Sequence, residues 1–362
     1  MLSNDANEKL TEALGKAKEL GIDVEKGGSI VLNETMLFRR LSEELEKKGI
    51  IYTEIHEAAK EYSDIFEKHA FMKVRGSLKE IDSGVFLYVP RGVILEKPIF
   101  NCFVLGKRGI VQRIYNLIII EDDSKAIGLS GCFTLVNEAI HSSLEEIHVG
   151  SNASFTKVML HNWLPKISVS AFTAVQLGRG GKYQDIYVNY SEARSISFNT
   201  RIYHEGDYSA SRADQIIATS GTGDLKYSTE VFLSRKGTSS QLISRLLSRD
   251  RGKIKSKTKI VAEEKETKGH IDCKGMLLGD GGEISTIPEL SSMSSDAELT
   301  HEASIGKIKK EELEYLETKG FTEEQAISLL VRGFLETGTT GLPESIKNSI
   351  DNILERLSRA KG

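Results

Sequence analysis

The strongest constraint on this chain is a long series of short β-rich segments between residues 84 and 287. The segments are rich in branched and aromatic residues and are separated by Gly, Asn, Asp and Ser. They recur at intervals of about 8–12 residues, a spacing typical of strands joined by tight turns. The first six are 85–89, 99–105, 110–120, 133–136, 143–148 and 155–160. This pattern predicts a mainly β core.

Residues 253–261 show how one such strand lies in its sheet. Lysines at every second position alternate with residues that can be buried, which are Ile254, Ser256, Thr258 and Ile260. The lysine face must contact water, where it also protects a sheet edge. No sharp repeat marks successive segments. A sandwich, a jelly roll and a β-helix therefore all remain open from periodicity alone.

The N-terminal region before the β-rich segments has the periodicity of helices. Apolar residues at helical spacing predict helices over 4–20, 34–48 and 54–70. Gly21 and Gly49 fit helix stops, and Asn33 fits a helix cap. These features predict an N-terminal helical domain over residues 1–75, followed by a β core over 76–306.

The chain returns to helix after residue 307. A helix is predicted over 311–319, and Thr322 with Gln325 forms a capping box that opens a second helix. Pro343 follows a break at Gly341 and fits the first turn of a third helix. We expect a C-terminal helical domain over residues 307–362.

Composition excludes several classes of protein. The chain has 362 residues with 48 Lys+Arg against 52 Asp+Glu, so its net charge of −4 does not favour polyanion binding. The basic stretch 245–268 contains no aromatic residue for base stacking, and we expect no nucleic-acid partner. No segment has the length of an apolar membrane helix, and the first residues do not resemble a signal peptide. We expect a cytoplasmic protein with no membrane partner.

Common catalytic motifs are absent from the sequence. The glycine-rich segment 178–183 lacks the spacing of a phosphate-binding loop, and Gly221 to Gly223 leads into a β-rich run rather than a helix. His301-Glu302 begins like a zinc-protease motif, but Ile305 stands where a second histidine is needed. We therefore expect a non-enzymatic protein, with any ATP hydrolysis supplied by a partner.

One segment brings metal-binding residue types together. Cys273, His270, His301 and Glu302 fall within about thirty residues, and thiolate, imidazole and carboxylate can all bind iron or zinc. Residues three apart or adjacent point to opposite faces of a strand, so at most one of each neighbouring pair should face a given site. The three cysteines are an odd number, which fits free thiols in a reducing compartment. Two of them lie beside phenylalanines and fit the core: Cys102 and Cys132.

Five segments resemble the SufB/SufD family of iron–sulfur cluster assembly scaffold proteins of the SUF system. They are 84–99 (GVFLYVPRGVILEKPI), 142–163, 269–273 (GHIDC), 299–306 (LTHEASIG) and 319–334 (KGFTEEQAISLLVRGF). The resemblance runs from about residue 80 to the C-terminus. It implies a right-handed parallel β-helix between helical terminal domains, which pairs through the β-helix with a second SufB/SufD-type subunit.

The resemblance also implies roles for particular residues. Cys273 falls on the SufB-type cysteine of nascent cluster assembly, His301 on the SufD-type histidine and Glu302 on the SufB-type glutamate, with His270 as a further candidate. A SufC-type ABC ATPase is expected to bind the C-terminal helices through Leu313, Leu316, Phe321, Leu329, Leu330 and Phe334. The sequence departs from the family where some SufB proteins have a sulfur-accepting cysteine, since Leu177-Gly178 stands there. Thr300 replaces a usual SufB glutamate, and no flavin site is assigned.

The number of cysteines limits the cluster that one chain can hold. A [4Fe–4S] cluster prefers four thiolates, whereas this chain has three cysteines, two of which fit the core. The expected site therefore lies at a dimer interface, homomeric or heteromeric, and holds a transient [2Fe–2S] or [4Fe–4S] cluster. A sulfur donor and apo-protein acceptors complete the expected partners.

Two alternatives remain open beside the scaffold. The chain could be a structural SufD-like partner without its own cluster ligand, needed for iron acquisition or complex assembly. A carbohydrate-active β-helix would need clustered acidic residues, and the tight acidic pairs in the first half of the β region are 122–123 and 145–146. Both pairs are more simply turns or solvated faces.

Overall fold

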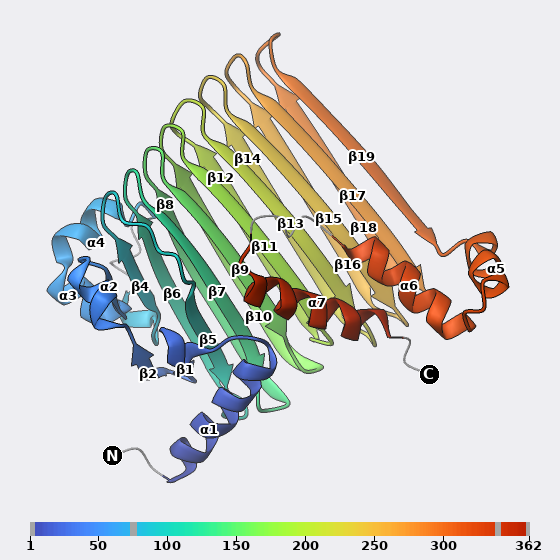
Figure 1. The fold of residues 1–362 in the computed structure, drawn as a ribbon, viewed down its shortest axis with the longest axis horizontal. Coiled ribbons are helices and arrows are strands. Elements are labelled where there is room, and N and C mark those ends of the chain that lie inside the picture. Colours follow the sequence, from blue (N-terminus) through green and yellow to red (C-terminus); the bar gives the residue numbers. More distant parts are fainter. Residues whose placement is uncertain (1–3, 73–77, 337–341, 360–362) are drawn as a thin grey trace.

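The computed structural model describes residues 4–72, 78–336 and 342–359, and its core is a β-solenoid of about eight turns built from two parallel sheets (Figure 1). Sheet A has the order β19-β17-β15-β13-β11-β9-β7-β5-β1-β2, and sheet B has the order β18-β16-β14-β12-β10-β8-β6-β4-β3. The mainly β core is therefore confirmed, and among the three architectures left open above the chain adopts the parallel β-helix.

The strand bounds are as follows. Sheet A contains β1 (Gly28–Leu32), β2 (Thr35–Arg40), β5 (Ile99–Leu105), β7 (Lys125–Thr134), β9 (Ser154–Asn162), β11 (Lys182–Ser191), β13 (Ala210–Thr219), β15 (Ser239–Arg249), β17 (Lys268–Leu278) and β19 (Glu298–Lys307). Sheet B contains β3 (Ile51–Glu54), β4 (Val85–Val89), β6 (Val111–Ile120), β8 (Glu138–Val149), β10 (Lys166–Leu177), β12 (Ser195–His204), β14 (Asp224–Leu233), β16 (Lys253–Ala262) and β18 (Glu283–Ser292). The expected strand 133–136 is wrong in its bounds, since β7 ends at Thr134.

Successive coils repeat through their turns rather than through a sequence motif. Residues with left-handed backbone recur every 28 or 29 positions, at Asp123, Asn152, Gly180, Tyr208, Gly237 and Glu266. The N–H of Asp123 donates to the Ser151 carbonyl at 2.8 Å, and the N–H of Asn152 donates to the Arg179 carbonyl at 2.7 Å. The turns therefore stack on one another as the strands do.

Alternation along each strand separates the lumen, the space between the two sheets, from the outer faces. In β16 the lysines point outward, while Ile254, Ser256, Thr258 and Ile260 are buried in the lumen. The predicted lysine face is confirmed, but its expected role in protecting a sheet edge is wrong, because β16 is paired on both sides, with β14 and with β18. Apolar lumen residues from both sheets form one continuous core along the solenoid.

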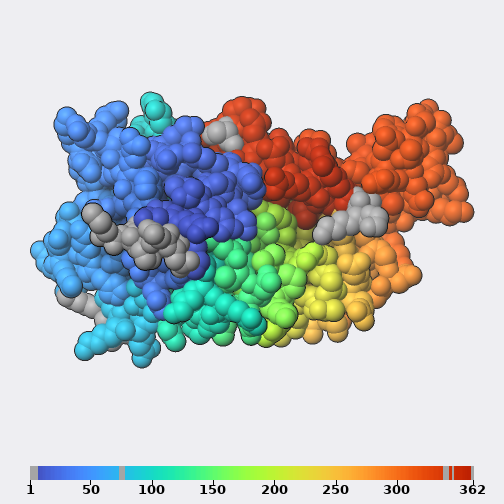
Figure 2. Space-filling model, turned by 90° about the horizontal axis from the view of Figure 1, so that it is seen from below, coloured from blue at the N-terminus to red at the C-terminus, as the bar shows by residue number. Residues whose placement is uncertain are grey.

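Helices cover parts of both outer faces. On sheet A, apolar residues of α1 (Asn4–Glu19), α6 (Glu323–Leu335) and α7 (Glu344–Ser358) pack on the outer side chains of the strands. On sheet B, α3 (Ile55–Glu61) and α4 (Ser63–His69) cover the first strands. At the other end of the solenoid α6 and α5 (Lys310–Thr318) project beyond the sheets (Figures 1 and 2). The helices expected over 4–20 and 311–319 and the capping box at Thr322 are confirmed.

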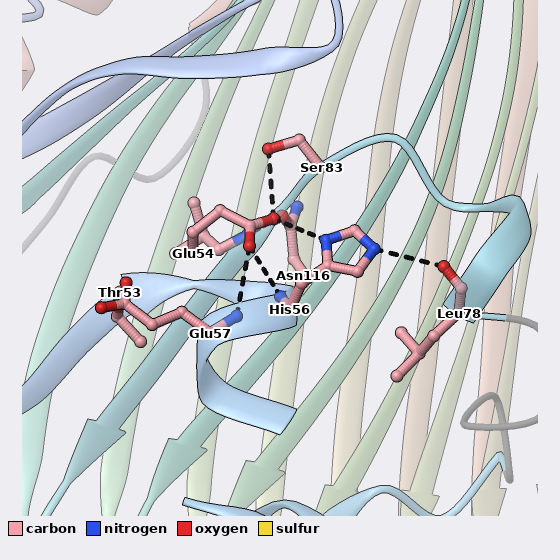
Figure 3. Close-up of polar contacts among 8 residues, drawn as sticks. Thr53, Glu54, His56, Glu57, Leu78, Ser83 and Asn116 are labelled. Carbon is pink, nitrogen blue, oxygen red and sulfur yellow. Dashed lines mark hydrogen bonds and ion pairs between the residues drawn. The ribbon is translucent and has the colours of Figure 1, made fainter. Parts of the chain in front are cut away.

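Polar contacts fix the start of α3 to the first coil (Figure 3). The Glu54 carboxylate accepts hydrogen bonds from the backbone N–H of His56 and Glu57 and contacts His56 Nδ1 at 2.9 Å. His56 Nε2 lies 3.2 Å from the Leu78 carbonyl. Both ring nitrogens face acceptors, which the protonated imidazole satisfies. Burial alone lowers the pKa of His56, but the hydrogen bond and charge of Glu54 outweigh it and raise this pKa.

The helix expected over 34–48 is wrong. Asn33 has a φ of 57° and stands in the turn between β1 and β2, which form an antiparallel hairpin with Leu32 paired to Thr35. Helix remains only in α2 (Glu43–Lys47). Asparagine tolerates the left-handed conformation of such two-residue turns, and the pairing of β1 with β5 overrides local helix propensity. The helix expected over 54–70 is broken at Tyr62 into α3 and α4.

The domain bounds 1–75, 76–306 and 307–362 stay a prediction. The first boundary and the break at Gly341 lie outside the described residues. Within 28–54, strands β1 to β3 pair with the two sheets, so this N-terminal region contributes strands as well as helices. Figure 2 shows the N-terminal residues lying against the solenoid.

The two ends of the solenoid differ. At the N-terminal end Met36, Leu41 and Leu45 pack on the lumen core and close it. At the C-terminal end β18 and β19 are paired on one side only within the described residues. Lumen-side residues there are uncovered, and Ile305 is 42% exposed. An unpaired sheet edge with apolar residues beside it offers a surface for another chain.

Candidate functional site

Cys273 lies in the lumen on β17, one coil before the open end. Its side chain is fully buried, and its Sγ lies 3.6 Å from Thr258 Oγ1 across the lumen. Lumen residues of β17 alternate with outer residues, so His270 points to the outer face, where its Nδ1 lies 2.8 Å from Thr300 Oγ1. The expectation that His270 and Cys273 occupy opposite faces is confirmed.

His301 and Glu302 lie on β19, the last strand of sheet A. His301 pairs with Ile271 and therefore lies on the lumen side, while Glu302 pairs with Asp272 on the outer side. Both are exposed, because no further coil covers β19 in the described part of the chain. The chain thus brings Cys273 and His301 to one side of sheet A and Glu302 to the other.

One chain does not complete a metal site. Among the described residues, no group of three or more His, Cys, Asp or Glu side chains is placed to hold a metal ion. On the outer face Asp272 is instead neutralised by Arg245 at 2.7 Å and by Lys274 at 3.7 Å.

A row of hydroxyls that the sequence analysis missed runs along the lumen towards Cys273. Thr173, Thr200, Thr229 and Thr258 are directly in register on sheet B. Sheet A also contributes a polar side chain on the facing side of the lumen. Gln215 Nε2 donates to Thr229 Oγ1 at 2.8 Å. The threonines recur every 27 to 29 residues, close to the spacing of the left-handed turn residues. This shared spacing is the sequence signal by which the row of threonines could have been found.

The other two cysteines are placed as expected. Cys102 packs under the helices on the outer side of sheet A, and Cys132 lies in the lumen core with its Sγ 3.8 Å from the sulfur of Met159. Burial raises the pKa of the Cys102 thiol and, together with the charge of Cys102, that of the Cys132 thiol. A thiol that stays protonated is a poor metal ligand.

The C-terminal helices expose apolar side chains. Tyr315 on α5 is 61% exposed, Phe321 between the helices is 41% exposed and Leu329 on α6 is 47% exposed. Among the other residues expected to bind an ATPase, Leu313, Leu316 and Leu330 are half-buried, and Phe334 packs partly on the core beneath α6. The same helix buries Ala326, Val331 and Leu335. One side of α6 is therefore buried, where it lies against α7, and the other faces outward.

The fold and site define a parallel β-solenoid with one lumen thiol near an uncovered end. Residues 103–334 match the family model described as SUF system FeS cluster assembly, SufBD core domain. The chain therefore belongs to the SufBD family, which acts in iron–sulfur cluster assembly. No helix in the described ranges is long and apolar enough to cross a membrane.

Relatives in two archaea support this membership. An iron-sulfur cluster assembly SufBD family protein of Methanothermobacter thermautotrophicus is 31% identical over 274 residues, which cover 75% of this chain and 67% of that protein. A protein of the same description from Archaeoglobus fulgidus is 29% identical over 377 aligned positions, covering 96% of this chain and 98% of the relative. The chain spans 63% of a second Methanothermobacter relative.

Proposed function

We propose that this protein is a scaffold subunit on which iron–sulfur clusters are assembled and then transferred. The observation that carries the proposal is the position of Cys273, with His301 on the same side of sheet A, beside the uncovered end of the solenoid. Thiolate sulfur and imidazole nitrogen are established iron ligands. Membership of the SufBD family supports the same role.

The cluster is cargo and needs ligands from two chains. A second SufB/SufD-type subunit, identical or related, pairs with the free edges of β18 and β19 and brings its own residues to Cys273. Two such thiolates with His301 make a site with few strong ligands. A cluster held in this way, [2Fe–2S] or [4Fe–4S], is easily released to an apo-protein acceptor. Cys273 is fully buried within one chain, so assembly also requires the last coil to move.

We propose that a SufC-type ABC ATPase binds the exposed side of α5 and α6. Tyr315, Phe321 and Leu329 supply apolar contact area there, and such exposed apolar groups mark protein interaction surfaces. The partner would hydrolyse ATP, while this chain serves as a non-enzymatic cytoplasmic scaffold. A sulfur donor supplies the sulfide, by a route other than a cysteine at residues 177–178.

Anaerobic reconstitution with ferrous iron and sulfide tests the proposal. The wild-type protein should gain a charge-transfer absorbance band and near-stoichiometric iron and sulfide, and Cys273→Ala should gain neither. Cys102→Ala removes a different buried thiol and should load like the wild type. Equal loading of wild type and Cys273→Ala would reject Cys273 as a ligand.

The burial of Cys273 favours a second candidate function. A structural SufD-like partner keeps its cysteine in the core, as observed here, and this chain also has Thr300 where SufB proteins usually have a glutamate. Such a subunit would support iron acquisition or complex assembly without binding the cluster. Failure of the wild type to bind iron in the reconstitution would favour this alternative.

A further inference from the structure

The lumen wall opposite Cys273 carries hydroxyl groups. Thr258 Oγ1 lies 3.6 Å from Cys273 Sγ, within hydrogen-bond range for sulfur, and both side chains are buried. Thr258 is the last threonine of the lumen row, because Pro288 follows it in the register. The row therefore ends at the thiol.

Two more hydroxyls lie on the same wall without partners. Ser256 precedes Thr258 by two residues on the same face of β16, and Thr286 pairs with Ser256 on β18. Ser256 Oγ and Thr286 Oγ1 are buried and have no hydrogen-bond partner within the described residues. A buried hydroxyl without a partner is destabilising. Both hydroxyls are therefore free to donate a hydrogen bond to a further acceptor at this wall.

Resting on the proposed function, we propose that Thr258 is a positioning residue that holds the Cys273 sulfur by a hydrogen bond between the Thr258 hydroxyl and this sulfur, and that Ser256 and Thr286 donate to sulfide of the cargo. Cluster sulfurs and thiolate ligands accept hydrogen bonds. The groups that donate these hydrogen bonds orient the ligands and influence how tightly the metal is bound.

Three variants of the full-length protein separate positioning from packing. Thr258→Val keeps the shape of the side chain and removes the hydroxyl, and Thr258→Ser restores a hydroxyl. Thr200→Val is the matched control, because Thr200 lies in the same buried row, about 10 Å away at two strand spacings, with no contact to Cys273. Thr200 also has an unpartnered hydroxyl in the described structure.

The first measurement is the infrared S–H stretch of the apo-protein, isolated by subtracting the spectrum of Cys273→Ala. The band should shift in Thr258→Val, return in Thr258→Ser and stay in place in Thr200→Val. An unshifted band in Thr258→Val would overturn the inference. This readout needs no iron, so it tests the hydrogen bond even if the protein fails to load a cluster and the proposed function falls.

The second measurement is the rate at which a chelator removes iron from the reconstituted protein. Removal of a hydrogen bond worth about 1 kcal/mol should make the release of iron from Thr258→Val roughly fivefold faster than from the wild type. Thr258→Ser should approach the wild-type rate, and Thr200→Val should match it. Equal acceleration by Thr258→Val and Thr200→Val would show a packing effect and overturn the inference, as would unchanged rates in both.

Discussion

The most unusual residues inside the solenoid are charged. Lys157 forms an ion pair with Glu145 in the lumen, and both side chains are buried together with Asp185. The expectation that the acidic pair 145–146 lies in a turn or on a solvated face is therefore wrong, because both residues are buried within β8. Burial alone lowers the pKa of Lys157, but the charges of Glu145 and Asp185 outweigh it and raise this pKa. Burial also raises the pKa of Asp185 to about 6. A buried ion pair adds little net stability, but removal of one partner leaves an uncompensated charge.

We therefore expect Lys157→Met to destabilise the fold by about 3–5 kcal/mol, since it strands Glu145 in the lumen. Urea unfolding followed by circular dichroism measures this change. Lys226→Met, on the exposed face of β14, is the control and should change stability by less than about 0.5 kcal/mol. A cost for Lys157→Met no larger than that of the control would contradict the prediction.

At the scale of elements, the docking of α4 on sheet B depends on histidine charge. The buried ring of His69 packs edge-on against His148 of β8 with 4.8 Å between ring centroids, and its Nε2 lies 3.2 Å from Glu121. Burial, with the charges of His148 and Lys68, lowers the pKa of His69 to about 4 against an ordinary value near 6.5. Between pH values of about 4 and 6.5, the His69 side chain therefore binds a proton in the unfolded chain but not in the folded chain.

Stability should therefore fall as the pH falls from about 6.5 towards 4. Thermal unfolding between pH 7.5 and 5 measures this decline. His69→Phe keeps a ring against His148 and removes the titrating group, so its melting temperature should fall less over the same interval. His56→Gln serves as the control. Because the raised pKa of His56 favours the folded state at low pH, the removal of His56 should not lessen the fall in melting temperature. The same slope in wild type and His69→Phe would refute the prediction.

At the scale of the whole molecule, the closed and open ends of the solenoid predict its assembly. The N-terminal end is closed by its own residues, whereas β18 and β19 keep free edges at the other end within the described chain. Repeat folds need a cap or a partner at each end. We propose that a second subunit covers this end in the working complex.

Ile305→Lys should weaken self-association, because it places a charge among the uncovered lumen residues of β19. Light scattering after size exclusion should show the mass of a dimer for wild type and that of a monomer for the variant. Ile140→Lys is the matched control, since Ile140 is similarly exposed, at 45%, but lies on the outer face of β8. A dimer that survives Ile305→Lys would place the interface elsewhere.

The sequence by itself determined features that depend on neighbours along the chain. The lysine face of β16 and the opposite faces of His270 and Cys273 follow from the two-residue period of a strand. The capping box of α6 follows from two residues three positions apart. The burial of Cys102 and Cys132 was expected from their apolar neighbours.

Only the tertiary structure decided how the strands pair. From β4 and β5 onward, each strand bonds to another about 30 residues away, and local periodicity carries no information about a partner at that distance. The same pairing aligned the lumen threonines and placed Thr258 against Cys273. Residues 35–40 became a strand through their hairpin with β1, which itself pairs with the distant β5. The pairing of the strands also left β18 and β19 with free edges among the residues that the structure describes, and this is where we propose that a second chain completes the site.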